Sequence, residues 1–164
     1  MRVITGIAKG TRLRTLEGND VRPTTDRVKE GIFSALQFGI EGRTFLDLFA
    51  GSGQMGIEAI SRGAKKAVFV DSSKKSLQVV NENIERTNNL LKQDEALIKN
   101  VKEVVSQINK GNLKERIIAK TDNDSLEELK NILNDMLEII SKKVNNDLVS
   151  IDEVLSKYKD MNFT

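Results

Sequence analysis

The stretch FLDLFAGSGQMG, residues 45–56, decides the expected fold. An apolar run that ends near Asp47 leads into three glycines with the spacing G-x-G-x-x-G: Gly51, Gly53 and Gly56. Such a turn between a buried strand and a helix lets a nucleotide-like cofactor approach the backbone. Asp71 ends the next apolar run, where an acid can accept hydrogen bonds from the two hydroxyls of a ribose. The stretch therefore predicts a nucleotide-type cofactor site.

Two classes of cofactor fit this pattern. A dinucleotide places its pyrophosphate at the helix N-terminus, where backbone N–H groups favour negative charge. Asp47 lies four residues before Gly51, and its carboxylate repels a pyrophosphate but attracts the ammonium group of a methionine moiety. The residues thus favour S-adenosylmethionine. They disfavour an NAD-binding oxidoreductase, for which the chain also has no histidine as catalytic base. A purely structural glycine turn is the third interpretation.

The segments around the glycine turn alternate between strand and helix. Apolar runs predict buried strands over 44–49 and 66–71. Helical patterns are expected over 53–63 and over 73–87. This order is the opening of a parallel α/β sheet. Five phenylalanines are assigned to its core: Phe33, Phe38, Phe45, Phe49 and Phe69.

The preceding residues predict a hairpin and a helix. A hairpin is expected over 2–16, with its turn at 9–10. The helix is expected to begin after Thr24 or Thr25 as N-cap, with Asp26 in its first turn. Its apolar positions share one face: Val28, Ile32, Ala35 and Leu36.

Composition excludes several kinds of site. The 164 residues include no cysteine and no histidine, which excludes disulfides, thiolate sites and histidine ligands, and no metal is expected. No apolar run approaches the ~18 residues of a membrane helix, and no signal peptide is recognised, so a cytoplasmic location is expected. The first 14 residues carry four cations and no acid, a patch that can meet phosphate: Arg2, Lys9, Arg12 and Arg14. A solvated hairpin face is the alternative.

Four blocks, in this order, resemble the bacterial small-subunit (16S) rRNA guanine-N2 methyltransferase family (RsmD-like): MRVITGIAKGTRLRTL, RPTTDRVKEGIFSALQ, FLDLFAGSGQMGIEAISRGA and AVFVD. The resemblance covers residues 1–90. It implies a partial Rossmann-like, S-adenosylmethionine-dependent methyltransferase domain over 1–91, with rRNA or the small ribosomal subunit as partner.

The resemblance also implies site residues. Those for the cofactor are Asp47, Phe49, Gly51, Gly53 and Asp71, joined by Arg22 and Thr24 of the RPTTDR stretch beside the active site. Those for RNA are Arg2, Lys9, Arg12, Arg14 and Arg27. Ordinary electrostatics at a helix start is the alternative for Arg22 and Arg27.

A catalytic centre is not found in the sequence. The family holds the acceptor amine with an Asn or Asp followed by two prolines and an aromatic residue. The chain has one proline, Pro23, so this motif is missing and no catalytic residue is assigned. The resemblance thus implies rRNA (guanine-N2) methylation by a domain that is expected to be incomplete and inactive.

The chain changes character near residue 90. Ten of its 11 glycines and eight of its nine arginines precede residue 92, and the remainder is almost continuously compatible with helix. We expect a boundary at 88–93 and an all-α, coiled-coil-like segment over 92–164. Its second helix has apolar residues spaced 3, 4, 3, 4: Leu126, Leu129, Leu133, Met136 and Ile140. The first helix, ended by Gly111, has a matching stripe: Leu97, Val101, Val104 and Ile108. Leu113 and Ile117 are isolated in the connector.

Residues 94–145 resemble a HAMP-type signalling segment of bacterial chemoreceptors. GNLKERI follows the first helix, and EEL precedes NDM in the second, although Glu127 stands where a glycine is usual. The resemblance implies a homodimer through 94–145 that forms a parallel four-helix bundle. The alternative function is therefore a non-enzymatic signalling or interaction module. The whole chain is interpreted as a chimera of two unrelated fragments, from natural truncation, an assembly error or an engineered fusion.

Overall fold

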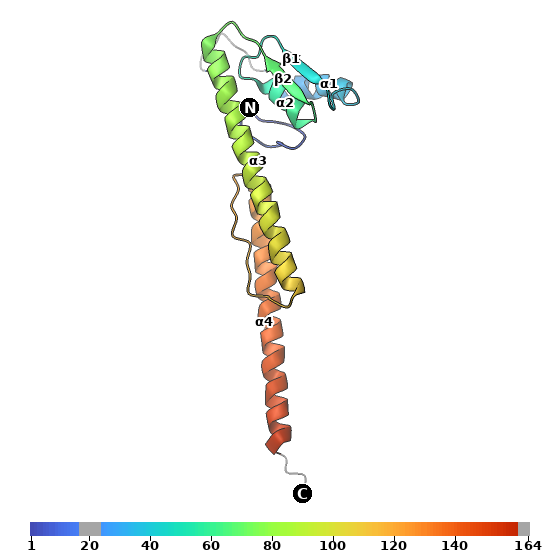
Figure 1. The fold of residues 1–164 in the computed structure, drawn as a ribbon, viewed down its shortest axis with the longest axis vertical. Helices are drawn as coiled ribbons and strands as arrows, with labels where there is room; N and C mark the ends of the chain where they lie inside the picture. Colours follow the sequence, from blue (N-terminus) through green and yellow to red (C-terminus); the bar gives the residue numbers. More distant parts are fainter. Residues whose placement is uncertain (17–23, 161–164) are drawn as a thin grey trace. The chain divides into compact units, whose positions relative to one another are not determined.

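The computed structural model describes residues 1–16 and 24–160 (Figure 1). The chain divides into two compact units, unit 1 (Met1–Gln93) and unit 2 (Asp94–Thr164). Helix α3 (Lys74–Asn109) runs through the boundary expected at 88–93. It does so because TNNLLK contains neither glycine nor proline to end a helix. That the units are a methyltransferase part and a HAMP-like segment stays a prediction.

Unit 1 contains a two-stranded parallel sheet. Strand β1 (Thr44–Asp47) pairs with β2 (Lys66–Phe69) over all four residues. Helix α2 (Gln54–Ser61) connects the strands, and α3 follows β2. Gly63, with φ +98°, follows the C-cap of α2. The expected order of strand, helix, strand and helix is confirmed, and so is the parallel pairing.

Helices cover one face of this sheet. Phe45 packs against the core cluster that contains Ala59 of α2, and Phe69 packs against the cluster that contains Ile57 of α2. Because successive side chains along a strand point to opposite faces, Leu46 lies on the other face, where it is 55% exposed. Leu48 and Val70, directly after the strands, are exposed as well. This second face is apolar and carries no covering helix among the described residues (Figure 1).

Helix α1 (Asp26–Leu36) begins as predicted, with Thr25 as N-cap and Asp26 in the first turn. Its expected apolar face, however, is largely exposed to solvent: Val28, Ile32 and Leu36. The side chains that α1 buries are Lys29 and Phe33. Phe33 lies in a core cluster with Ala59 of α2, so α1 packs through a face that apolar spacing did not indicate.

Lys29 is buried because its ammonium group has partners. Nζ donates a hydrogen bond to the carbonyl oxygen of Arg2 at 2.7 Å and lies 3.2 Å from a carboxylate oxygen of Asp26. A buried charge without such partners costs several kcal/mol. The lysine therefore ties α1 to the N-terminal segment.

The N-terminal hairpin is shorter than predicted. One antiparallel bridge joins Arg2 and Arg12, and the amide of Val3 donates to the carbonyl of Thr11 at 3.0 Å. The residues between leave the pairing because they bind α2. Gly6 has φ +88°, and a Cβ there would lie 1.7 Å from the carbonyl oxygen of Ser61.

Two of the five phenylalanines assigned to the core are not in it. Phe38 is 95% exposed and Phe49 is 91% exposed, whereas Phe33 is buried and Phe45 and Phe69 pack against the core clusters. Phe38 lies beyond the end of α1, and Phe49 lies in the loop after β1. Both are outside the elements whose faces meet, and the core assignment of these two residues was wrong.

Unit 2 contains the remainder of α3, a connector and helix α4 (Asp124–Asp160). Figure 1 shows the two helices running in the same direction. Helix α3 ends at Asn109, and Gly111 follows with φ +85°, as expected. Four buried side chains form the core: Leu97, Val104, Ile117 and Leu137. Ile117 of the connector is therefore a core residue rather than an isolated one.

The connector is held through its backbone. The side-chain oxygen of Asn134 accepts the N–H of Ile117 at 2.9 Å, and its nitrogen donates to the Ile117 carbonyl at 3.0 Å. The side-chain oxygen of Asn100 accepts the amides of Ile118 and Ala119. These bonds explain why the connector packs along both helices rather than looping away from them.

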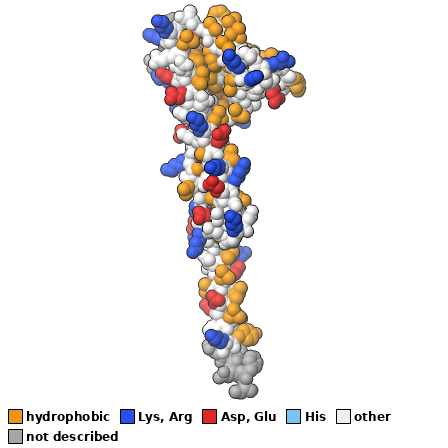
Figure 2. Space-filling model, in the orientation of Figure 1, with side chains coloured by type: hydrophobic (Ala, Val, Ile, Leu, Met, Phe, Trp, Pro, Cys, Tyr) orange, Lys and Arg blue, Asp and Glu red, His pale blue; other side chains and the backbone are white. Residues whose placement is uncertain are grey.

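The predicted seam of α4 is only partly used inside unit 2. Leu126 and Leu133 pack against the core, with Leu137 completing this face. Three of the five seam positions are exposed: Leu129, Met136 and Ile140. A coiled coil is thus not shown. Helix α4 instead has one buried apolar stripe and a second apolar face that is exposed. Figure 2 shows exposed hydrophobic side chains along its lower half, toward the C-terminus.

Candidate functional site

The glycine turn lies at the carboxyl end of β1. Gly53 is the N-cap of α2 in the left-handed region, with φ +78°. A Cβ on Gly53 would lie 3.2 Å from the methyl groups of Val80, and one on Gly56 would lie 2.2 Å from the ring of Phe69. Gly53 therefore permits the left-handed N-cap of α2, and Gly56 permits the close packing of α2 on the sheet.

Asp71 follows β2 and braces the same turn. Its Oδ2 accepts the amide of Gly51 at 2.8 Å, and its Oδ1 accepts the amide of Ser73 at 2.8 Å. These bonds, led by that from Ser73, hold the pKa of the Asp71 carboxyl below its usual value. The Ser76 side chain is a further donor to this carboxylate. An ionised carboxylate has about four acceptor sites, so Asp71 can still accept a hydroxyl hydrogen bond from a ligand while it braces the glycine turn.

Asp47 is the last residue of β1 and is half-buried. Its Oδ2 accepts the amide of Gly56, the third residue of α2, at 3.3 Å. Burial raises the pKa of the Asp47 carboxyl, and the nearby Asp71 charge raises it further. The amides of Gly56 and Phe49 oppose this rise. The carboxylate thus sits at the N-terminus of α2 and takes one of its unpaired amides.

The two carboxylates fit one class of cofactor better than the other. A helix N-terminus ordinarily attracts an anion, but here Asp47 already brings negative charge to it. Asp47 ends β1 and Asp71 lies just after the neighbouring strand β2, and both are acceptors when ionised. The pair suits a ligand with an ammonium group and ribose hydroxyls, as in S-adenosylmethionine, and it disfavours a pyrophosphate. Among residues 1–16 and 24–160, no three potential metal ligands gather closely enough to hold an ion.

Other predicted cofactor residues are placed as follows. Thr24 lies beside the start of α2. The amide of Gln54, oriented to satisfy both partners, donates to the Thr24 carbonyl at 3.2 Å and accepts its N–H at 2.8 Å. Phe49 points into solvent from the loop before Gly51. Arg22 lies outside the described residues.

The basic hairpin is partly neutralised. A guanidinium nitrogen of Arg14 lies 2.6 Å from the Glu82 carboxylate, and one of Arg2 lies 3.9 Å from Asp26. The residues of the hairpin itself do not indicate these acids, because the acids come from α3 and α1. The other predicted RNA-contacting residues are exposed: Lys9, Arg12 and Arg27.

Asn83 supports the site and was missed by sequence reasoning. It is buried on α3, where its side-chain oxygen accepts the amide of Arg14 at 2.7 Å. Its nitrogen donates to the carbonyls of Arg14 and Ser52, at 3.0 and 2.8 Å. Asn83 therefore fixes the glycine turn to the hairpin. The available signal was an amide between the apolar positions Val80 and Ile84 on one helix face.

Strand, glycine turn, helix and an acid after the second strand define an α/β protein with the layout that a nucleotide-type cofactor site requires. A family model, described as "Conserved hypothetical protein 95", matches residues 1–117. The chain belongs to this family. The match reaches past the end of unit 1, to residue 117.

Named relatives match a similar region. "Putative rRNA methyltransferase YlbH" of Bacillus subtilis (strain 168) is 50% identical over 84 residues, which are 51% of this chain and 46% of the relative. Ribosomal RNA small subunit methyltransferase D of Haemophilus influenzae is 41% identical over 85 residues, 52% of this chain and 44% of the relative. The chain spans about half the length of the curated relatives it matches.

A solved structure of a hypothetical protein from Thermus thermophilus is 34% identical. The similarity covers 54% of this chain and 50% of that one, with a TM-score of 0.47. In the described part of the chain, no helix is apolar over enough residues to cross a membrane.

Proposed function

We propose that the chain supplies the cofactor-binding half of an S-adenosylmethionine-dependent rRNA (guanine-N2) methyltransferase. The observation that carries this proposal is the pair Asp47 and Asp71, which flank the glycine turn after neighbouring parallel strands. The family assignment and the name of the Haemophilus influenzae relative support the reaction class. The cofactor, when bound, supplies the methyl group that the reaction transfers.

In this proposal each residue has a limited task. Asp47 receives the ammonium group of the cofactor, and Asp71 receives the ribose hydroxyls. Gly51 and Gly53 let the cofactor approach the backbone. The hairpin cations contact rRNA phosphates, which position the substrate without reading its sequence. The chain offers no acceptor motif to hold the guanine amine, because Pro23 is its single proline.

Binding of S-adenosylhomocysteine is expected to be weak and to be reduced by Asp47→Ala and by Asp71→Ala. The pKa of Asp47 is raised, so its carboxylate becomes protonated at a higher pH than an ordinary aspartate. Affinity should therefore be full above that raised pKa and should fall as the pH drops through it. Titration calorimetry over a pH series measures this dependence.

Two further variants serve as controls for the pH dependence of S-adenosylhomocysteine binding. Asp47→Asn should bind weakly with little dependence on pH in this range, whereas Glu30→Gln, an exposed change on α1, should behave as the wild type. An unchanged pH profile in Asp47→Asn would remove Asp47 from the site. Tight binding of NAD, with no binding of S-adenosylhomocysteine, would overturn the choice of cofactor.

RNA affinity is expected to depend more on Lys9 and Arg12 than on Arg2 and Arg14, which face carboxylates. The double variant Lys9→Gln/Arg12→Gln should reduce the slope of log affinity against log salt by roughly 0.7–0.9 per lost phosphate contact. Arg2→Gln/Arg14→Gln should reduce it less. Fluorescence anisotropy with a small-subunit rRNA fragment measures both slopes. An unchanged slope in the first variant would leave the patch as a solvated face.

The chain by itself is expected to transfer no methyl group to small-subunit rRNA or to assembled small-subunit particles. Holding the guanine amine against the methyl group can lower the barrier of such a reaction by roughly 7–11 kcal/mol. The acceptor motif that would hold the amine is missing from the chain. A radiolabelled transfer assay, with the Haemophilus influenzae relative as positive control, tests this. Labelled guanine would show that residues 92–164 build an acceptor site.

Unit 2 supports a second candidate function, a dimeric helical module of the HAMP type. The observation in its favour is the packing of α3, the connector and α4 around one core, with an apolar stripe of α4 left exposed. A second copy that covered this stripe through residues 94–145 would complete a four-helix bundle.

A further inference from the structure

One edge of β2 is open. The amides of Lys66 and Val70 donate to the carbonyls of Arg43 and Asp47, on the side of β1. In a parallel pair, successive residues alternate between the two edges of a strand. The N–H and C=O groups of Ala67 and Phe69 therefore point away from β1. No strand pairs with them among residues 1–16 and 24–160. Such an edge is a template for a further strand.

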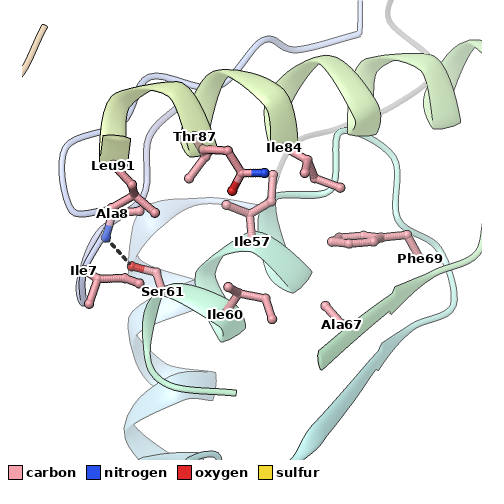
Figure 3. Close-up of a pocket in the computed structure, with 11 residues that line it drawn as sticks. Ile7, Ala8, Ile57, Ile60, Ser61, Ala67, Phe69, Ile84, Thr87 and Leu91 are labelled. Atoms are coloured by element: carbon pink, nitrogen blue, oxygen red, sulfur yellow. Dashed lines mark hydrogen bonds between the residues drawn. The ribbon is translucent and has the colours of Figure 1, made fainter. Parts of the chain in front are cut away.

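The open edge borders an apolar cavity. The side chains of Ala67 and Phe69 line a space of about 210 Å³ that continues between α2 and α3 (Figure 3). Ile60 of α2 and Ile84 and Leu91 of α3 form its other walls. None of the predicted cofactor or RNA residues that the structure describes lines it. The lining side chains expose apolar surface to solvent, and an apolar side chain that filled the space would bury that surface.

The curated relatives extend well beyond the residues that this chain matches. This chain covers 46% and 44% of the Bacillus subtilis and Haemophilus influenzae relatives, so the larger part of each has no counterpart among the aligned residues. A two-stranded sheet is marginal by itself, and parallel sheets are covered on both faces. Here one face bears exposed Leu46, Leu48 and Val70. A strand-bearing polypeptide is what this incomplete sheet fits.

We propose that the open edge of β2 and the adjoining cavity are an acceptor site for a second polypeptide, of the kind that forms the unmatched part of these relatives. An extended segment pairs with the backbone of Ala67 and Phe69. One of its apolar side chains enters the cavity between α2 and α3. The proposal rests on the family assignment and is independent of whether the chain binds a cofactor.

Amide exchange of the full chain tests this pairing directly. The chain is co-expressed with an affinity-tagged fragment that contains the unmatched part of the Haemophilus influenzae relative, and the complex is isolated through the tag. Exchange at Ala67 and Phe69 should slow by roughly tenfold or more on capture, since their amides become paired. Exchange at Val68, whose amide already faces β1, should change little. Capture that leaves Ala67 and Phe69 exchanging at their free rates would overturn the proposal, as would the absence of capture.

Two variants add a matched comparison. Ala67→Glu places a charge at the mouth of the cavity and should reduce capture by roughly tenfold or more. Lys66→Glu places the same group on the next residue, on the other face of the strand, and should capture as the wild type. Circular dichroism checks the fold of both, and Ile84→Glu replaces Ala67→Glu if that variant unfolds. Equal capture by a folded cavity variant and by Lys66→Glu would reject the site.

Calorimetry with S-adenosylhomocysteine on the chain without the fragment separates this proposal from the proposed function. Lost capture with cofactor binding intact rejects the acceptor site alone. Lost cofactor binding with capture intact rejects the cofactor-binding function alone.

Discussion

Replacing Glu58 by alanine is expected to lower the free energy of unfolding of unit 1 by about 3–5 kcal/mol, the usual cost of breaking a buried ion pair. Glu58 is fully buried on α2. Its carboxylate accepts the amides of Ile4 and Thr5, at 2.8 and 3.1 Å, and Nε of Arg62 at 2.8 Å. The alanine variant leaves two amides and a largely buried guanidinium without this acceptor.

The loss should extend beyond α2. Arg62 also lies over the ring of Phe33, 4.8 Å from its centroid, so Glu58 holds in place a contact between α2 and α1. The effect is measured by urea unfolding followed through NMR signals of unit 1. Glu30→Ala, on the exposed side of α1, should change the free energy by less than about 0.5 kcal/mol. A loss below about 1 kcal/mol for Glu58→Ala would mean that water replaces the carboxylate at little cost.

The sequence predicted the parts of unit 1 that depend on local signals. The strand, glycine turn and helix around Gly53, the N-cap at Thr25 and the helix end at Gly63 each follow from backbone preferences of nearby residues. The parallel pairing of β1 and β2 follows from the helix between them. These elements position Asp47 and Asp71, and the expected turn was therefore correct in form.

The parts that depend on distant residues were not predictable. Glu58 and Asn83 are polar residues on otherwise apolar helix faces, and their partners in the N-terminal segment are 53 to 69 positions away. Local sequence could not show that Glu82 pairs with Arg14 either. Phe49 was assigned to the core because it is apolar, yet no described element of unit 1 covers the loop that carries it.

In unit 2 the periodicity predicted a helix but not its faces. The spacing 3, 4, 3, 4 selects Met136, whereas the core contains its neighbour Leu137. Ile117 of the connector shares the buried cluster with Leu137 of α4. Leu126, Leu133 and Leu137 form the inner face of α4. The predicted seam therefore mixes inner positions with outer ones.

Met136 is an exposed position of the predicted seam of α4. Met136→Asp is expected to dissociate a dimer of the full chain while α4 stays folded. Met136 is 46% exposed, and a dimer that covers it would bury the new carboxylate. That burial should cost about 3 kcal/mol or more, which is roughly a hundredfold or more in the dissociation constant. Equilibrium sedimentation measures the constant, and circular dichroism measures the helix content.

Two variants show which face of α4 is involved. Leu137→Asp, one residue further on and 4% exposed, should unfold the helix pair itself, because its charge enters the core of unit 2. Asn131→Asp introduces the same charge at an exposed polar position and should leave both the dimer and the helix content unchanged. A wild-type chain that sediments as a monomer would mean that the exposed stripe does not pair with a second copy. A dimer that survives Met136→Asp would place the contact outside this stripe, since no dimer can keep an unpaired charge in a covered seam without cost.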